Sequence, residues 1–233
     1  MKPLPVQEVS GDKDAPSLPA RVVLMGSQQR MLGSRHEIYV NYILKLETPQ
    51  GLQAGNISFP WRQDSDEITV HKVLIHRGDQ TIDVLKAGQT FTVLRREQNL
   101  EQSTLDGVLT ANMFPEGLQV RDALEVATTV VSNDPVLAGH GEASFGPLNT
   151  AIDRAHLRLL WKPADKVRLS ETPDLPPWKR GREGEFETAE LTLESAKSVT
   201  VPDDAPVRFR IVRYAQASDF ASTRQAMISA ILR

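Results

Sequence analysis

The 233-residue chain contains no cysteine, and its net charge is only -3. The absence of cysteine excludes disulfides, thiolate zinc sites and a cysteine nucleophile. Near-neutral charge gives little bulk attraction for a polyanion, so we expect no nucleic-acid partner. No apolar run approaches the roughly 20 residues that a membrane helix requires. We therefore expect no membrane insertion.

Motifs for catalysis and cofactors are also missing. The chain has no Gly-x-Ser-x-Gly sequence, phosphate loop or dinucleotide fingerprint. None of its five histidines has the spacing of a metal site: His36, His71, His76, His140 and His156. We expect no catalytic residue, no metal and no cofactor. His71 and His76 would face opposite sides of a regular strand, and only a bulge would change that.

The sequence does contain many strand-like runs. From Glu37 to Glu47 alternate residues are apolar, which predicts an antiparallel strand with one buried face formed by Ile38, Val40, Tyr42, Leu44 and Leu46. Further runs cover 21–25, 57–61, 67–76, 81–85, 91–97, 107–114, 124–132, 155–161, 186–193 and 207–214. Pro60 marks 57–61 as an edge strand or bulge, and 140–150 is expected to be a loop. Short strands separated by turns every ~8–12 residues predict an all-β fold, an antiparallel β-sandwich.

The two ends of the chain have a different character. Residues 1–19 hold four prolines, which predicts an extended N-terminal arm. From Asp219 onward the apolar residues are spaced helically behind Ser218, a residue suited to cap a helix. We therefore expect an arm over 1–19, a β-sandwich domain over 20–214, and a short C-terminal helix or a linker toward a downstream domain over 215–233.

One segment also carries a family resemblance. Residues 90–112, TFTVLRREQNLEQSTLDGVLTAN, together with 115–122, indicate two strands joined by a polar segment and closed by a turn. With 48–61, 69–73 and 81–85, they resemble a bacterial domain of unknown function found immediately N-terminal to transglutaminase-like (papain-like) domains. The resemblance spans roughly residues 20 to 220 and implies an accessory β-domain. It also implies a periplasmic or secreted protein whose leader is absent from this chain.

The same segment supplies the candidate binding residues. Arg95, Arg96, Glu97 and Glu101 form a charge-dense group. Its arginines either pair with nearby carboxylates and order a loop, or hold a carboxylate on a partner domain or peptide. Trp61 and Trp178 are the aromatic candidates; each either packs locally or belongs to a binding surface.

Three functions are consistent with this sequence. The first is a non-catalytic accessory module that binds or positions a downstream transglutaminase-like domain, or holds an extended peptide by strand addition. The second is a carbohydrate-binding β-sandwich acting on cell-envelope polysaccharide. Coplanar exposed aromatics favour the second, whereas an apolar patch beside an unpaired strand edge favours the first. The third, a hydrolase, requires a polar cleft with a perturbed carboxylate or histidine.

Overall fold

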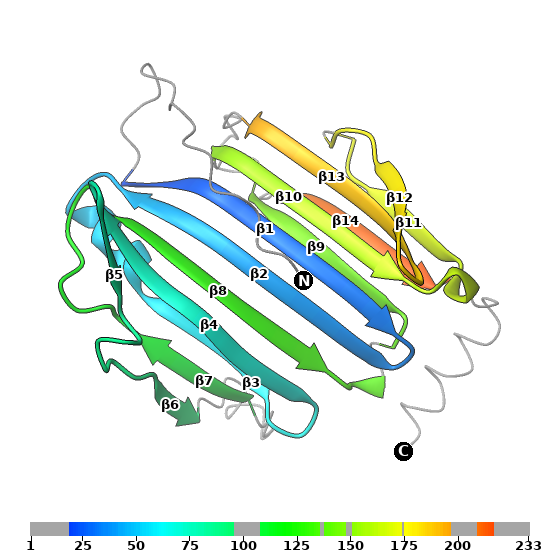
Figure 1. The fold of residues 1–233 in the computed structure, drawn as a ribbon, viewed down its shortest axis with the longest axis horizontal. Helices are drawn as coiled ribbons and strands as arrows, with labels where there is room; N and C mark the ends of the chain where they lie inside the picture. The colour runs from blue at the N-terminus through cyan, green and yellow to red at the C-terminus, as the bar shows by residue number, and fades with distance from the viewer. Residues whose placement is uncertain are drawn as a thin grey trace, which may run out of the picture.

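The computed structural model describes residues 19–95, 108–135, 138–147, 151–173, 175–196 and 209–216. Their fold is all-β, as the alternating sequence pattern predicts (Figure 1). The strands form one eight-stranded sheet and two three-stranded sheets. Two short 3-10 helices, η1 (Gln50–Gly55) and η4 (Pro163–Asp165), connect strands.

The large sheet has the strand order β12-β13-β10-β1-β2-β8-β4-β5. Its strands are β1 (Ala20–Leu32), β2 (Arg35–Leu46), β4 (Asp66–Arg77), β5 (Gln80–Asp83), β8 (Ala123–Ser132), β10 (Ile152–Trp161), β12 (Lys179–Glu183) and β13 (Phe186–Ala196). Every neighbouring pair is antiparallel except β1 with β10, which are parallel. The antiparallel prediction therefore holds for every neighbouring pair of this sheet except β1 and β10.

Two small sheets complete the described fold. One has the order β11-β14-β9 and contains β9 (His140–Pro147), β11 (Val167–Glu171) and β14 (Phe209–Gln216). The other has the order β3-β7-β6 and contains β3 (Ile57–Arg62), β6 (Thr92–Arg95) and β7 (Val108–Met113). Pro60 lies in β3 at the edge of its sheet, as predicted.

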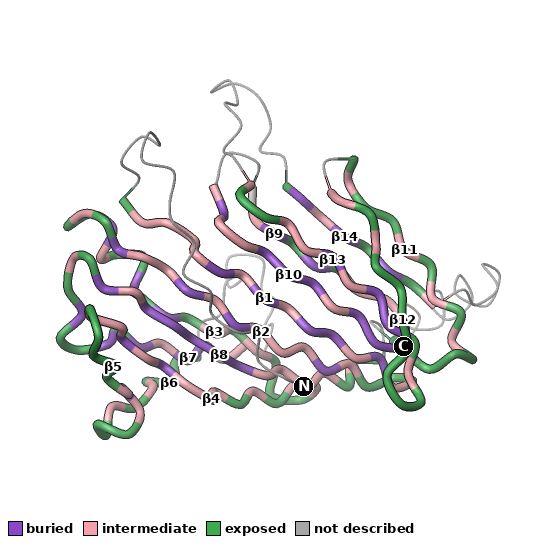
Figure 2. Tube along the Cα trace, turned by 45° about the horizontal axis from the view of Figure 1, so that its top comes forward, coloured by how far each residue is buried: buried purple, intermediate pink, exposed green. Residues whose placement is uncertain are grey.

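Each small sheet buries its own hydrophobic core against the large sheet, and Figure 2 shows the buried residues along the central strands. In the first core, Phe145 of β9 and Tyr214 of β14 pack with Leu157 of β10. In the second, Ile57 of β3 and Met113 of β7 pack with residues of β2, β4 and β8. The strand register places both cores on one face of the large sheet, and most side chains on the opposite face are polar.

The five apolar residues predicted to share a face of one strand do lie on alternate positions of β2. Only Leu46 is fully buried, and the other four are half-buried. Ile38 and Val40 belong to neither core, whereas Leu46 lies in the second core and Tyr42 packs against it. Ile43, on the opposite face, is buried at 3% exposure.

The predicted loop over 140–150 is wrong, since β9 occupies His140–Pro147. Gly141 and Gly146 suggested a loop, but pairing with β14 and burial of Ala143 and Phe145 outweigh the weak β-propensity of glycine. Strands β11 and β12, in the proline-rich stretch after Trp161, were likewise not predicted. All three strands depend on hydrogen bonding to a neighbouring strand, which their own sequences do not reveal.

The predicted ends of the chain fall mostly outside the described residues. This applies to residues 1–18 of the expected arm and to the expected helix from Asp219. Pro19 is described, and its carbonyl accepts hydrogen bonds from the backbone N–H groups of Glu47 and Thr48. Strand β14 continues to Gln216, two residues beyond the expected end of the β-domain at 214.

Candidate functional site

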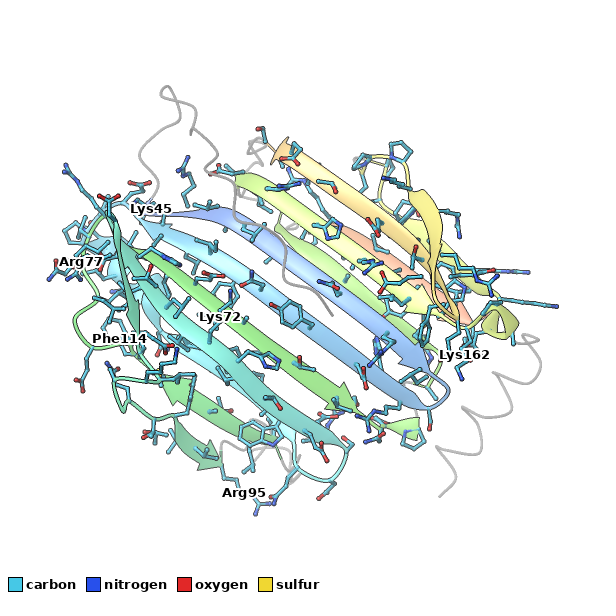
Figure 3. The ribbon with its side chains drawn as sticks, viewed as in Figure 1. Lys45, Lys72, Arg77, Arg95, Phe114 and Lys162 are labelled. Atoms are coloured by element: carbon cyan, nitrogen blue, oxygen red, sulfur yellow. The ribbon has the colours of Figure 1, made fainter. Side chains whose placement is uncertain are left out.

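The most distinctive surface feature is the edge strand β6. It pairs with β7 and ends its three-stranded sheet. All four of its residues are exposed, including Val93 at 54% and Leu94 at 46%. Phe114, just beyond β7, is 51% exposed and is labelled with Arg95 in Figure 3. Large apolar side chains therefore lie open along this edge, which we call the β6 edge: Thr92–Arg95.

Two other edge strands of the described fold are protected. Strand β12, at one end of the large sheet, is fully exposed and carries Lys179, Arg180 and Arg182. Strand β3, at the other edge of the β6 sheet, contains Pro60. Charges and prolines on an edge discourage the addition of another strand. The β6 edge has neither device within Thr92–Leu94.

The structure brings two of the predicted candidates together. Trp61 of β3 and Arg95 of β6 both pair with Leu109 of β7, so their side chains lie on one face of the small sheet. The two outer strands are about 10 Å apart, at two strand spacings. Trp61 is half-buried and Arg95 is exposed. Arg95 therefore lies beside the open edge, in the segment where the sequence placed the binding residues.

The remaining candidates lie elsewhere or are not described. Trp178 packs against the first core, next to β12, and does not join the β6 edge. Arg96, Glu97 and Glu101 lie outside the described residues, so the expected ordering of their loop stays a prediction. The apolar side chains of the β6 edge were not predicted as site residues, because sequence alternation does not reveal which strand will end a sheet.

The tryptophans do not form a common stacking surface. Trp161 is 1% exposed, and its Nε1 donates a hydrogen bond of 2.9 Å to Glu187. It belongs to the first core, as does the half-buried Trp178, whereas Trp61 lies in the other small sheet. The arrangement gives no support to sugar binding through coplanar tryptophans.

The face of the large sheet opposite the cores is a polar surface. Glu125 of β8 is 3% exposed and accepts hydrogen bonds from Lys72 and from His76 Nε2, the latter at 2.8 Å. Burial raises the pKa of Glu125, but the hydrogen bonds from Lys72 and His76, with the charges of these residues, outweigh burial and lower it. The carboxylate therefore stays ionised and paired.

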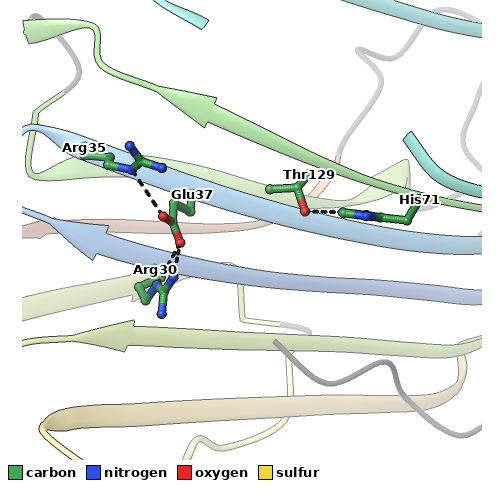
Figure 4. Close-up of polar contacts among 5 residues, drawn as sticks. All are labelled: Arg30, Arg35, Glu37, His71 and Thr129. Carbon is green, nitrogen blue, oxygen red and sulfur yellow. Dashed lines mark hydrogen bonds and ion pairs between the residues drawn. The ribbon is translucent and has the colours of Figure 1, made fainter. Parts of the chain in front are cut away.

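Glu37 and His71 also have hydrogen-bond partners on this face (Figure 4). Glu37 accepts from Arg30 Nε at 2.8 Å and from Arg35 Nε at 3.2 Å. A bulge between Val70 and Lys72 interrupts the alternation of β4 and brings His71 to the face that carries His76. His71 Nε2 lies 2.7 Å from the Thr129 hydroxyl.

The described residues contain no group of three or more His, Cys, Asp or Glu that could hold a metal ion. In that same part of the chain, no helix is both long enough and apolar enough to cross a membrane.

Burial lowers the pKa of His36 to about 4, with His140 adding to the effect, and His36 contacts Tyr214 inside the fold. His36 therefore contributes to a contact between β2 of the large sheet and β14 of a small sheet.

The fold and its open edge define an all-β module with one large and two small sheets. The chain belongs to the family described as a domain of unknown function with a solved structure (DUF3857), which matches residues 34–200. The match lies within the region of the resemblance noted from the sequence. No curated protein matches the chain.

Solved structures were compared with this fold, and one that shares it does so at low sequence identity. A putative protease from Parabacteroides distasonis superimposes with a TM-score of 0.73 and 8% identity, over 86% of this chain and 41% of that chain. An M1 zinc metallopeptidase from Deinococcus radiodurans, an E323A mutant with a bound Tyr-Ser-Ala substrate, gives a TM-score of 0.43 at 9% identity over 84% of this chain and 42% of that chain. A putative nutrient binding protein from Legionella pneumophila gives 0.39 at 10% identity, over 93% of this chain and 72% of that chain.

Proposed function

We propose that this chain is a non-catalytic accessory β-sandwich module that binds an extended segment by strand addition at the β6 edge. The observation that carries the proposal is the exposure of Val93 and Leu94 on an edge strand. Thr92–Leu94 has neither the charges of β12 nor the proline of β3. Adding a strand would pair backbone groups along β6, and main-chain hydrogen bonds supply affinity in this mode of binding.

The side chains of β6 would supply selectivity. Val93 and Leu94 are consecutive, so they project from opposite faces of the strand. A segment with apolar side chains on both faces would cover both of them. Arg95, at the end of β6, would interact with a carboxylate near the end of that segment, in the role that the sequence suggested.

The proposed partner is a downstream transglutaminase-like domain, or an extended peptide positioned for it, in a periplasmic or secreted protein. The fold match to the putative protease occupies 41% of that chain. This share supports the idea of a module that accompanies a larger protein, and the resemblance in the sequence suggests the type of domain. We propose no reaction for the module itself.

The experiment measures amide hydrogen exchange at residues 92–95 while a strand-forming peptide is added. The probe is a soluble peptide of about ten residues in which pairs of valines alternate with pairs of threonines, so that both faces of the strand carry valine. Its matched control carries proline at alternate positions and cannot pair as a strand. We expect selective protection of 92–95 by the first peptide only, and loss of this protection in the V93K/L94K variant.

Two results would contradict the proposal. One is equal protection by the proline peptide, and the other is unchanged binding by V93K/L94K. A soluble cell-wall glycan forms the third arm of the experiment. Saturable glycan binding that requires Trp61, without an effect of the peptide, would replace strand addition by the polysaccharide-binding alternative.

A further inference from the structure

A second surface feature lies on the large sheet and is independent of strand addition at the β6 edge. Four apolar residues belong to neither hydrophobic core of the described fold: Ile38 and Val40 of β2, Ile68 of β4 and Val130 of β8. Val130 pairs with Ile38 on one side and with Ile68 on the other. Three of the four therefore form one row across three adjacent strands. We call the four residues the central patch.

The central patch is on the face of the sheet that carries the cores. Val130 and Val126 lie an even number of positions apart in β8, as do Ile38 and Tyr42 in β2, so each pair projects from one face. Val126 belongs to the second core, and Tyr42 packs against it. Val126 is 0% exposed, whereas all four patch residues are only half-buried. Part of their apolar surface is therefore open to solvent.

Strand β14 ends close to the central patch. The Tyr214 hydroxyl donates a hydrogen bond to Gln29, and Gln29 is the register partner of Ile38. The strand ends at Gln216, whose backbone N–H donates to the Gly139 carbonyl at 2.6 Å. Packed sheets are about 10 Å apart and neighbouring strands about 5 Å, so the chain leaves β14 roughly 10–15 Å from Ile38.

The sequence that follows β14 has the side chains to cover this patch. Residues 217–233 lie outside the described residues, and their sequence predicts a helix from Asp219 behind Ser218. A helix over 219–233 is about 22 Å long, and the three strands of the patch span about 10 Å. One side of this helix carries an apolar stripe: Phe220, Met227, Ile228 and Ile231.

We propose that residues 219–233 dock on the central patch as an amphipathic helix, with the apolar stripe against Ile38, Val130 and Ile68. An isolated helix of this length is marginal in water and needs tertiary contacts. The patch is an apolar surface without a core of its own. Burying the stripe against it removes both apolar surfaces from water, which stabilises the helix and the sheet together.

Disulfide trapping tests this contact, because the chain contains no cysteine of its own. The double variant V130C/M227C is compared with T129C/M227C. Thr129 is next to Val130 in β8 and is also half-buried, but it projects from the opposite face. We expect an intramolecular disulfide in the first variant, at a yield independent of protein concentration, and its loss in the second. I38C/M227C and I68C/M227C are further arms, since disulfide geometry is specific.

Variants without cysteine give an independent measurement. M227D/I231D places charges in the stripe, whereas S222D/S229D places them on the opposite side of the expected helix. We expect M227D/I231D to shift the methyl NMR resonances of Ile38 and to lower the urea midpoint. S222D/S229D should change neither.

Four results would overturn the proposal. The first is equal cross-linking of V130C/M227C and T129C/M227C, and the second is no intramolecular disulfide from any of the three patch cysteines. The third is unchanged methyl resonances in M227D/I231D. The fourth is a disulfide-linked dimer as the main product, which would assign the patch to a second copy of the chain.

Discussion

Tyr214 and His36 connect two sheets of the fold across 178 positions of sequence. The Tyr214 hydroxyl lies 2.7 Å from Nε2 of His36 and donates its proton to Gln29 Oε1. Because that proton is already used, the hydroxyl accepts from Nε2–H of a neutral His36. Their rings meet edge to face, with centroids 5.7 Å apart. This contact attaches β14 to β1 and β2 at the border of the first core.

The protein should lose stability in acid through His36. Its pKa falls from 6.5 to about 4 in the folded protein, so between these values the unfolded chain binds the extra proton. Stability from this group is complete above about pH 6.5 and declines as the pH falls toward 4, by at most about 3 kcal/mol. Urea unfolding measured across this range checks the prediction.

A comparison of two histidine variants separates the contribution of His36 to the pH dependence of stability from that of the carboxylates. His36→Gln should flatten the decline between pH 6.5 and 4, because glutamine does not titrate. His71→Gln, at an exposed histidine, should keep the full decline. Parallel curves for the original protein and His36→Gln would contradict the assignment.

Lys72 should stabilise the fold more than an ordinary surface lysine does. Glu125 is 3% exposed, and Lys72 is one of its two side-chain partners. Lys72→Ala leaves the buried carboxylate partly uncompensated, so we expect a loss of about 1–3 kcal/mol in the free energy of unfolding. Adding Glu125→Gln should restore part of this loss.

Lys86 provides the matched control for Lys72. Its Nζ lies 3.0 Å from Asp83, and its side chain is 86% exposed. Exposed ion pairs contribute little, so Lys86→Ala should change stability by less than about 0.5 kcal/mol. Chemical denaturation of the variants at one pH and salt concentration measures these differences. Equal losses for both lysine variants would refute a special contribution from Lys72.

Gly141 should tolerate no side chain. A Cβ at this position would overlap the Tyr214 hydroxyl and lie 2.6 Å from Tyr214 Cζ. Gly141→Ala must therefore displace the ring that contacts His36, with an expected cost of about 1–3 kcal/mol. Gly181→Ala is the control, since its Cβ would meet only the Thr188 hydroxyl, at 3.1 Å. Thermal unfolding that ranks Gly181→Ala as the more damaging change would contradict this prediction.

The side chains of the β6 edge should matter for binding and little for folding. Val93 and Leu94 are about half exposed, at 54% and 46%. Val93→Lys and Leu94→Lys should each change the free energy of unfolding by no more than about 0.5 kcal/mol. Calorimetric unfolding of the single variants provides the measurement. A loss of several kcal/mol would show that these residues support the fold, and would remove the basis for a binding edge.

The sequence predicted the individual strands well where one face meets a core. Alternation identified β2 and β10, because every second residue of β10 from Ala155 to Trp161 is buried. It failed for β9, whose glycines suggested a loop until β14 supplied a pairing partner. Of the candidate binding residues, Trp61 and Arg95 lie on one face of the small sheet and Trp178 belongs to another region, while their role in binding stays a prediction.

By itself the sequence determined the all-β class, the edge position of Pro60, and the lack of any thiol chemistry. Local periodicity and residue type are sufficient for such conclusions, since they depend on near neighbours. Tertiary structure alone decided that β1 and β10 pair in parallel, that β6 ends a sheet, and that Asn41 is buried across from His156. Each of these features depends on which strands, distant in the sequence, become neighbours in the fold. That pairing is selected by the total apolar surface buried in the whole fold, which no local stretch of sequence reveals.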